Sequence, residues 1–144
     1  MPTYVFSTAK DLTAAQRVRI VETVTSIHHV EAKAPRFFVQ VIFHKIEPGS
    51  MFLGGGPAPI DHVWVRADIR SGRTDEQRAN ILRRIMRETG EILQISQENV
   101  WVYISEIPAQ NIAELGAILP PPGGEEEWLA ALPAALREKL LSAS

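Results

Sequence analysis

The sequence predicts an α/β fold in which two βαβ repeats form a four-stranded sheet with two helices on one face. Three observations predict this fold class: an internal repeat, a helix-capping motif present once in each copy, and strands of clear periodicity. Shifting the 144-residue chain by 61 positions aligns Thr13 with Thr74 and Val41 with Val102. A repeat that spans a helix start and the following strand indicates two copies of one supersecondary unit.

The first repeat, about 2–47, has the order strand, helix, strand. Tyr4–Thr8 is rich in residues that favour strands. The segment Thr13-Ala-Ala-Gln16 has the T-x-x-Q form of a capping box, whose side chains bind the free backbone amides of a helix start. Pro35 prevents this helix from continuing, and the aromatic and β-branched run Phe37–Phe43 predicts the second strand.

The helix of the first repeat has an apolar stripe at helical spacing. The stripe consists of Val18, Val21, Val24 and His28, and it is widened by Ile20 and Ile27. Residues spaced three or four apart share one face of a helix. We therefore expect this stripe to face the sheet.

The second repeat, about 62–108, has the same order. Val63–Ile69 alternates apolar and polar residues, which is the period of a half-buried strand. Thr74-Asp-Glu-Gln77 is a second capping box, and Ile81, Ile85 and Ile92 form the core stripe of its helix. Val100–Ile104 predicts the fourth strand. A strand-helix-strand crossover makes the strands of each repeat parallel and the connection right-handed.

Two helices on one face leave the other face of the sheet without cover inside the chain. Because alternate residues of apolar strands point to that face, we expect an oligomer to bury it. The whole chain, residues 1–144, is read as one domain with a C-terminal packing tail from about 118 to 144. Within the tail, Pro120–Gly124 is a stiff break, and Glu125–Leu141 predicts a helix interrupted near Pro133. We expect this tail to pack between subunits.

Composition excludes several classes of function. Apolar residues make up 45% of the chain, enough for a buried core, and the net charge of −2 gives no long-range field for nucleic acid or an anionic membrane. The absence of cysteine removes disulfides and thiolate metal sites. No segment has the length of a membrane span or the form of a signal peptide, so a soluble cytoplasmic protein is expected.

Two features of the sequence could carry chemistry. If Met1 is removed, Pro2 becomes a terminal secondary amine, and α-amino groups titrate near neutral pH, although a proline at the second position can also have no role. Arg70-Ser-Gly-Arg73 sets two guanidinium groups directly before a capped helix. Together with the free helix amides they suit a carboxylate. The alternative is neutralisation on the surface by Asp75 and Glu76.

Other polar residues have ordinary structural explanations as well as functional ones. His28 on an apolar stripe can be a satisfied core residue, Tyr103 can be strand packing, and Glu114 can be a solvated helix residue. Gly54-Gly55-Gly56 lacks the Lys and Ser/Thr of a phosphate loop and is predicted to be a flexible loop. No spacing of metal ligands is present, so no metal and no cofactor are expected.

Taken together, these residues resemble the tautomerase superfamily, and more narrowly the cis-3-chloroacrylic acid dehalogenase family. The resemblance includes Pro2, the two βαβ repeats and the R-S-G-R-T motif at 70–74. It extends to the motifs Phe52-Leu-Gly-Gly55, Trp101-Val-Tyr103, Pro108-Ala-Gln110, Glu114-Leu-Gly116 and Pro122-Gly-Gly-Glu-Glu-Glu-Trp128. The six positions that define the family's site are filled by Pro2, His28, Arg70, Arg73, Tyr103 and Glu114.

The resemblance implies a homotrimer and a role for each residue. Arg70 and Arg73 would bind a substrate carboxylate with help from His28, and Glu114 with Tyr103 would activate water. Pro2 would deliver a proton to carbon. The reactions implied are hydration of short unsaturated carboxylates, hydrolytic dehalogenation of 3-haloacrylates and tautomerisation of phenylenolpyruvate. Two alternatives remain open: a tautomerase of an unknown 2-keto acid with negligible dehalogenation, and a non-catalytic binding protein in which Met1 is retained.

Overall fold

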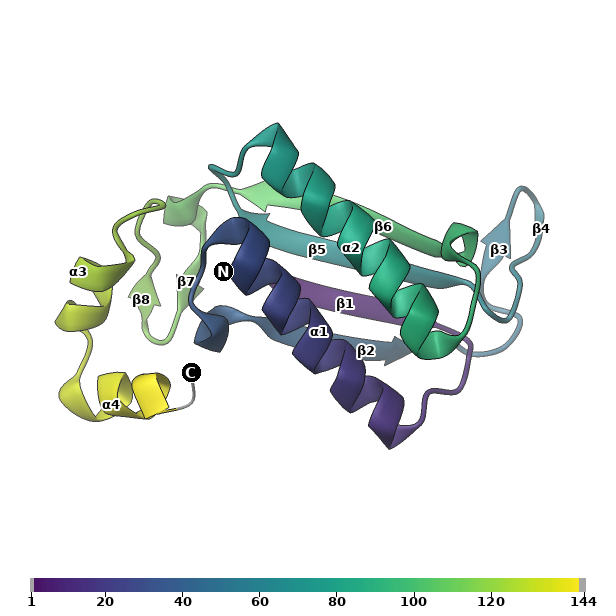
Figure 1. Ribbon diagram of the computed structural model, residues 1–144, viewed down its shortest axis with the longest axis horizontal. Helices are drawn as coiled ribbons and strands as arrows, with labels where there is room; N and C mark the ends of the chain where they lie inside the picture. Colours follow the sequence, from purple (N-terminus) through teal and green to yellow (C-terminus); the bar gives the residue numbers. More distant parts are fainter. Residues whose placement is uncertain (1, 143–144) are drawn as a thin grey trace.

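The computed structural model describes residues 2–142, and its centre is a four-stranded sheet covered on one face by two long helices (Figure 1). The sheet has the order β2-β1-β5-β6, made of β1 (Thr3–Thr8), β2 (Gln40–Lys45), β5 (Val63–Arg70) and β6 (Val100–Ile107). The pairs β1–β2 and β5–β6 are parallel, whereas the central pair β1–β5 is antiparallel. The predicted fold class is confirmed.

The two helices are α1 (Ala14–Ala32) and α2 (Asp75–Leu93). Both begin with the predicted capping box, in which Thr13 binds the amide of Gln16 and Thr74 binds the amide of Gln77. Each helix then ends on a residue in the left-handed region, with φ of 54° at the first C-cap and 55° at the second. The two helices thus share start, length and termination, as the shift of 61 predicts.

The repeat continues beyond the predicted strands into two small hairpins. The first pairs β3 (Phe52–Leu53) with β4 (Gly56–Pro57), and the second pairs β7 (Ala113–Glu114) with β8 (Ala117–Ile118), again 61 positions apart. The prediction of a flexible loop at residues 54–56 was wrong. Gly54 and Gly55, with φ of 58° and 86°, form the tip of the first hairpin, because glycine adopts positive φ without steric cost.

The predicted boundary of the second strand was also wrong, because Phe37 and Phe38 belong to a short 3-10 turn, η1 (Arg36–Phe38), and β2 begins only at Gln40. The turn follows Pro35, whose fixed φ suits it. Phe38 is buried against Leu119 and the ring of Trp128, outside the sheet. Packing against the tail, which strand propensity cannot reveal, decides this boundary.

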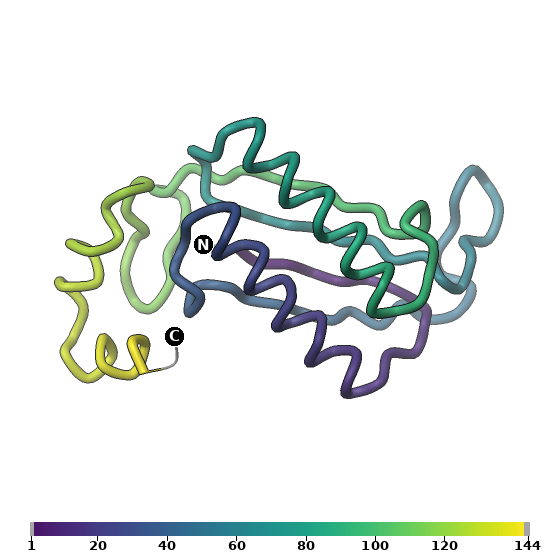
Figure 2. The backbone as a smooth tube through the Cα atoms, in the orientation of Figure 1, coloured from purple at the N-terminus to yellow at the C-terminus, as the bar shows by residue number. Residues whose placement is uncertain are grey.

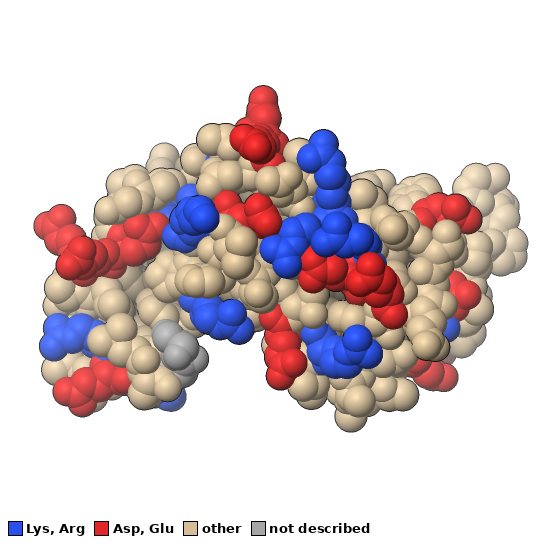
Figure 3. Space-filling model, viewed as in Figure 1, with Lys and Arg blue, Asp and Glu red and all other residues tan. Residues whose placement is uncertain are grey.

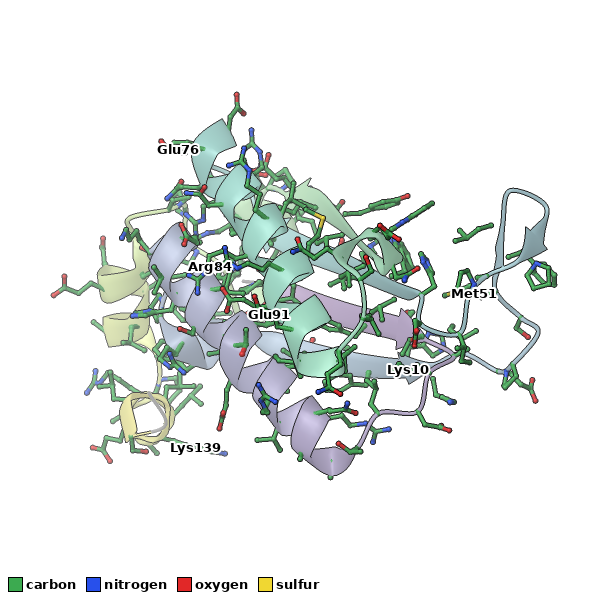
Figure 4. The ribbon with its side chains drawn as sticks, turned by 45° about the vertical axis from the view of Figure 1, so that its right-hand side comes forward. Lys10, Met51, Glu76, Arg84, Glu91 and Lys139 are labelled. Carbon is green, nitrogen blue, oxygen red and sulfur yellow. The ribbon has the colours of Figure 1, made fainter. Side chains whose placement is uncertain are left out.

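The buried face of α1 differs from the predicted stripe. Ile20, Val24, Ile27 and His28 are buried, whereas Val18 and Val21 are exposed by 56% and 37%. At about 100° per residue, the sheet and α2 can bury only part of so wide a stripe. Ions decorate the opposite surface: Figure 3 shows both signs of charge intermixed over the helices. One such contact joins the helices, with Arg84 3.0 Å from Glu31 (Figure 4 labels Arg84).

The ends of the sheet carry different structures (Figure 2). The hairpin β3–β4 projects from one end, and the tail lies at the other beside β7 and β8. The tail contains α3 (Glu125–Ala131) and α4 (Ala134–Ser142), so the predicted interruption near Pro133 is confirmed. Two further 3-10 turns, η2 (Gln97–Asn99) and η3 (Ala109–Asn111), flank β6. Within residues 2–142, no helix combines the length and apolar character needed to cross a membrane.

Candidate active site

The start of β1 is where most of the predicted site residues meet. Pro2 is buried directly before β1, and its carbonyl oxygen accepts a hydrogen bond from the Gln40 amide at 3.0 Å. The antiparallel register of β1 and β5, continued by one residue, sets Pro2 beside Ile69 and next to Arg70. Removal of Met1 concerns a residue outside those that the structure describes.

His28 lies near the end of α1 and points into this region. It is only 2% exposed, and its Nδ1 lies 2.8 Å from the hydroxyl of Tyr4, with the two rings edge to face. Burial, followed by the positive charge of Arg73, lowers the pKa of His28 to about 3, so the imidazole is neutral at pH 7. Burial raises the pKa of Tyr4, so its phenol keeps its proton and can donate to Nδ1.

Arg70 ends β5 and is 2% exposed, which is rare for an arginine. Its Nη1 donates to the Pro120 carbonyl oxygen at 2.6 Å, and its Nη2 donates to Glu125 of α3. The alternative of surface neutralisation by Asp75 and Glu76 fails for this residue. Asp75 pairs with Arg78, and Glu76 points outward from the far end of α2 (Figure 4).

Arg73 is half-buried and lies close to Arg70. Burial, and after it the positive charge of Arg70, lowers the pKa of Arg73. Among the described residues, Nε of Arg70 and Nε of Arg73 are the buried side-chain nitrogens that lack a hydrogen-bond partner. A buried donor without a partner is costly, at about 1–3 kcal/mol, and two beside each other suit one carboxylate.

Glu114 belongs to β7 in the second hairpin, not to a helix as its surface interpretation assumed. It is half-buried and faces a hollow of about 310 Å³. The hollow is lined by Phe37, Phe38, Val39, Gln40, Glu114 and Leu115. Since Gln40 also binds Pro2, the hollow adjoins the start of β1.

Tyr103 is the predicted residue that the chain does not bring to this place. It lies in β6 opposite Arg66, four positions before the level of Arg70, which is roughly 13 Å along the strand. Its side chain is 54% exposed on the sheet face without helices, where its ring packs edge to face on Trp64 at 5.9 Å. Within residues 2–142, no group of three or more His, Asp or Glu is arranged to hold a metal ion.

Comparison with known proteins assigns the family. Residues 1–131 match the Tautomerase_3 family model, described as “Putative oxalocrotonate tautomerase enzyme”. The chain belongs to the tautomerase superfamily. No curated protein matches the chain in a sequence search.

Solved tautomerase structures refine the relationship. N1, a member of the cis-3-chloroacrylic acid dehalogenase family, is 42% identical over 97% of this chain and 99% of its own, with a TM-score of 0.94. Native Ps01740 is 35% identical over 78% of this chain and 99% of its own, with a TM-score of 0.73. A wild-type fused 4-OT, F6, solved as an asymmetric trimer, shares the fold at 18% identity, covering 81% of this chain and 94% of its own, with a TM-score of 0.75.

Two residues of this tautomerase-superfamily site were missed from the sequence. Tyr4 carries a signal that could have found it, since strand alternation places it on the helix side of β1, facing α1. Glu125 carries none, because its contact with Arg70 joins residues 55 positions apart. Its motif was noted only as part of the resemblance.

Proposed function

We propose that this chain is a cofactor-independent enzyme that adds water to short unsaturated or 3-haloacrylic carboxylates and interconverts enol and keto acids such as phenylenolpyruvate. The carrying observation is the meeting of Pro2, His28, Arg70 and Arg73 at the start of β1, beside the hollow that contains Glu114. The relationship to N1, whose title names the dehalogenase family, supports the same chemistry.

The two arginines bind the substrate carboxylate in this proposal. Their unpartnered Nε–H groups are buried, and a carboxylate oxygen accepts strong hydrogen bonds from guanidinium donors. His28 assists as a neutral donor: with Nδ1 bound to the Tyr4 hydroxyl, its proton resides on Nε2. A neutral imidazole adds no third positive charge to the pair of arginines.

The proton transfers fall to Pro2 and Glu114. Once Met1 is removed, the cationic Pro2 amine gives a proton to C2 of a 3-haloacrylate while Glu114 takes a proton from water that attacks C3. The resulting 3-halo-3-hydroxy acid loses HX and gives malonate semialdehyde. With an enol, the Pro2 amine moves one proton from oxygen to carbon, and no water is consumed.

Tyr103 completes the site of a neighbouring subunit in a homotrimer. The helix-free face exposes Ile42, Trp101 and Tyr103 by 43%, 41% and 54%, and β2 and β6 leave two free sheet edges. Different surfaces that meet head to tail close into a ring, which is the symmetry of a trimer. Light scattering tests this: a stable monomer at micromolar concentration contradicts the trimer.

Proton NMR with a panel of substrates tests the reaction. The panel contains cis- and trans-3-chloroacrylate, propiolate, 2-butynoate and phenylenolpyruvate, and we expect turnover of at least one unsaturated acid and of the enol. Intact-mass measurement checks that Met1 is absent from the active protein. Turnover of no member of the panel by Met-free protein refutes the enzymatic proposal, and a retained Met1 supports a binding protein.

A further inference from the structure

The C-terminal turn at residues 120–125 is packed onto the arginine loop between β5 and α2. Gly72, between the two arginines, has a φ of +108°, and a Cβ built on it would lie 2.7 Å from Cγ of Pro122. Real Cβ contacts are never so short, so glycine is required here for close approach as well as for its backbone angle. The turn and the loop therefore form one packed unit, although 50 residues separate them.

Glu125 fastens this unit through both of its carboxylate oxygens. Oε1 accepts from Nη2 of Arg70, and Oε2 accepts from the Gly123 amide at 2.8 Å. The Pro120 carbonyl holds the other terminal nitrogen of Arg70 at 2.6 Å. Both Nη atoms of Arg70 are thus bound by the turn, and Nε alone is left without a partner.

The turn is also tied to the wall of the hollow. Trp128, one turn further along α3, donates from Nε1 to the Ile118 carbonyl at 2.8 Å, and its ring packs on Phe38 with centroids 5.5 Å apart. Leu119, just before the turn, is buried in the same cluster. The segment 118–128 is therefore connected at one end to Phe38 and at the other to Arg70.

We propose that Glu125 is a positioning residue that fixes the Arg70 guanidinium so that its Nε–H, together with that of Arg73, is presented to the substrate carboxylate. This role rests on the proposed function. The geometry favours positioning over competition with substrate, because Glu125 takes a terminal nitrogen and leaves free the donor that lacks a partner. Its own rotation is limited in turn by the Gly123 amide.

The test compares Glu125→Ala and Glu125→Gln with Glu126→Ala, a control at the next, exposed position of α3. Propionate is the probe, because a saturated acid binds without reacting, and its dissociation constant is measured by calorimetric titration. Hydrogen exchange of the amides at 119–131 reports whether the turn stays packed. We expect Glu125→Ala to weaken propionate about 10- to 100-fold and to speed exchange, since hydrogen bonds to charged groups are the strong ones.

We expect Glu126→Ala to bind like wild type, and Glu125→Gln to lie between, because glutamine keeps an acceptor but not the charge. With a substrate, the loss in Glu125→Ala should appear in KM more than in kcat. If Glu125→Ala does not fold, as judged by circular dichroism, the glutamine variant decides the question by the same readouts.

Several outcomes overturn the proposal. Unchanged propionate affinity in the Glu125 variants means that Arg70 needs no support from the tail. Tighter binding means that Glu125 competes with the substrate. A wild-type protein that binds neither propionate nor any acid of the panel refutes the proposed function itself, whereas wild-type binding with unaffected Glu125 variants refutes only this inference.

Discussion

The hydroxyl of Tyr4 lies 2.8 Å from Nδ1 of His28, and this buried contact joins the first strand to the end of the first long helix. Tyr4 is fully buried and His28 is 2% exposed, so neither group can exchange its partner for water. The contact also orients the imidazole, because the ring nitrogen that faces Tyr4 is committed to it. His28 is therefore a fixed, neutral group beside two arginines.

The first prediction concerns stability in acid. The pKa of His28 is about 3 in the folded chain, mainly because of burial, against 6.5 for a free histidine. Between these values the unfolded chain binds more protons, so this group lowers the free energy of unfolding as pH falls from about 6.5 towards 3 and has no effect above that range. Urea unfolding of wild type and His28→Gln at several pH values measures it. The variant should lose stability less steeply, and parallel curves would contradict the assignment.

The second prediction separates the two arginines. Arg73→Ala should weaken short carboxylates by about 1.5–3 kcal/mol with little loss of stability, because the Arg73 side chain is half-buried. Arg70→Ala should weaken them similarly and also lower the free energy of unfolding by roughly 3 kcal/mol or more, since it leaves the partly buried Glu125 carboxylate without its cation. Propionate titration and urea unfolding provide the two readouts. Equal stability of the two variants would remove the distinction.

The third prediction separates two chemistries in one site. Glu114→Gln keeps the shape of the side chain but removes the base, and loss of a general base costs about 10²–10⁴-fold. Hydration or dehalogenation should fall by that factor, while phenylenolpyruvate tautomerisation should be largely kept. Pro2→Ala should impair both. Paired rates on an unsaturated acid and on the enol test this, and equal losses in Glu114→Gln would show that Glu114 organises the pocket instead.

The fourth prediction uses two glycines with positive φ. Gly72→Ala brings a Cβ against Pro122 and should separate the C-terminal turn from the arginine loop, with faster amide exchange at 119–131. Gly49→Ala is the control, because its φ is +82° but nothing lies within 4 Å of the added Cβ. Both variants carry backbone strain, of order 1–3 kcal/mol. Only Gly72→Ala should weaken propionate, and equal effects on binding would mean that strain alone is responsible.

Much of the fold could be predicted from local sequence signals. The capping boxes at Thr13 and Thr74, the alternation at Val63–Ile69 and the shift of 61 residues gave the sheet, the helices and their order. These signals succeed because they depend on neighbours along the chain. The predicted strand at Phe37 failed because Trp128 and Leu119, far along the chain, decide where those rings are buried.

The site was less accessible from the sequence for the same reason. Residue types suggested Pro2, Arg70 and Arg73, but the partner of Arg70 was expected among the acids of the next helix and is Glu125 of the tail. The tail, which we expected to serve packing between subunits, makes this contact within its own chain. Pairing across 55 residues leaves no periodic trace that a single sequence could reveal.

The matched hairpins carry a consequence for how the molecule divides its labour. Shifted by 61 positions, the five gathered site residues correspond to Val63, Thr89, Ala9, Leu12 and Leu53. One backbone plan is thus written twice, once with reactive groups and once with residues that cannot exchange a proton with a substrate. The silent half answers only to folding and assembly, so its hairpin, β3–β4, can vary in sequence at no catalytic cost, and a three-chain ring would hold three sites where its backbone has room for six.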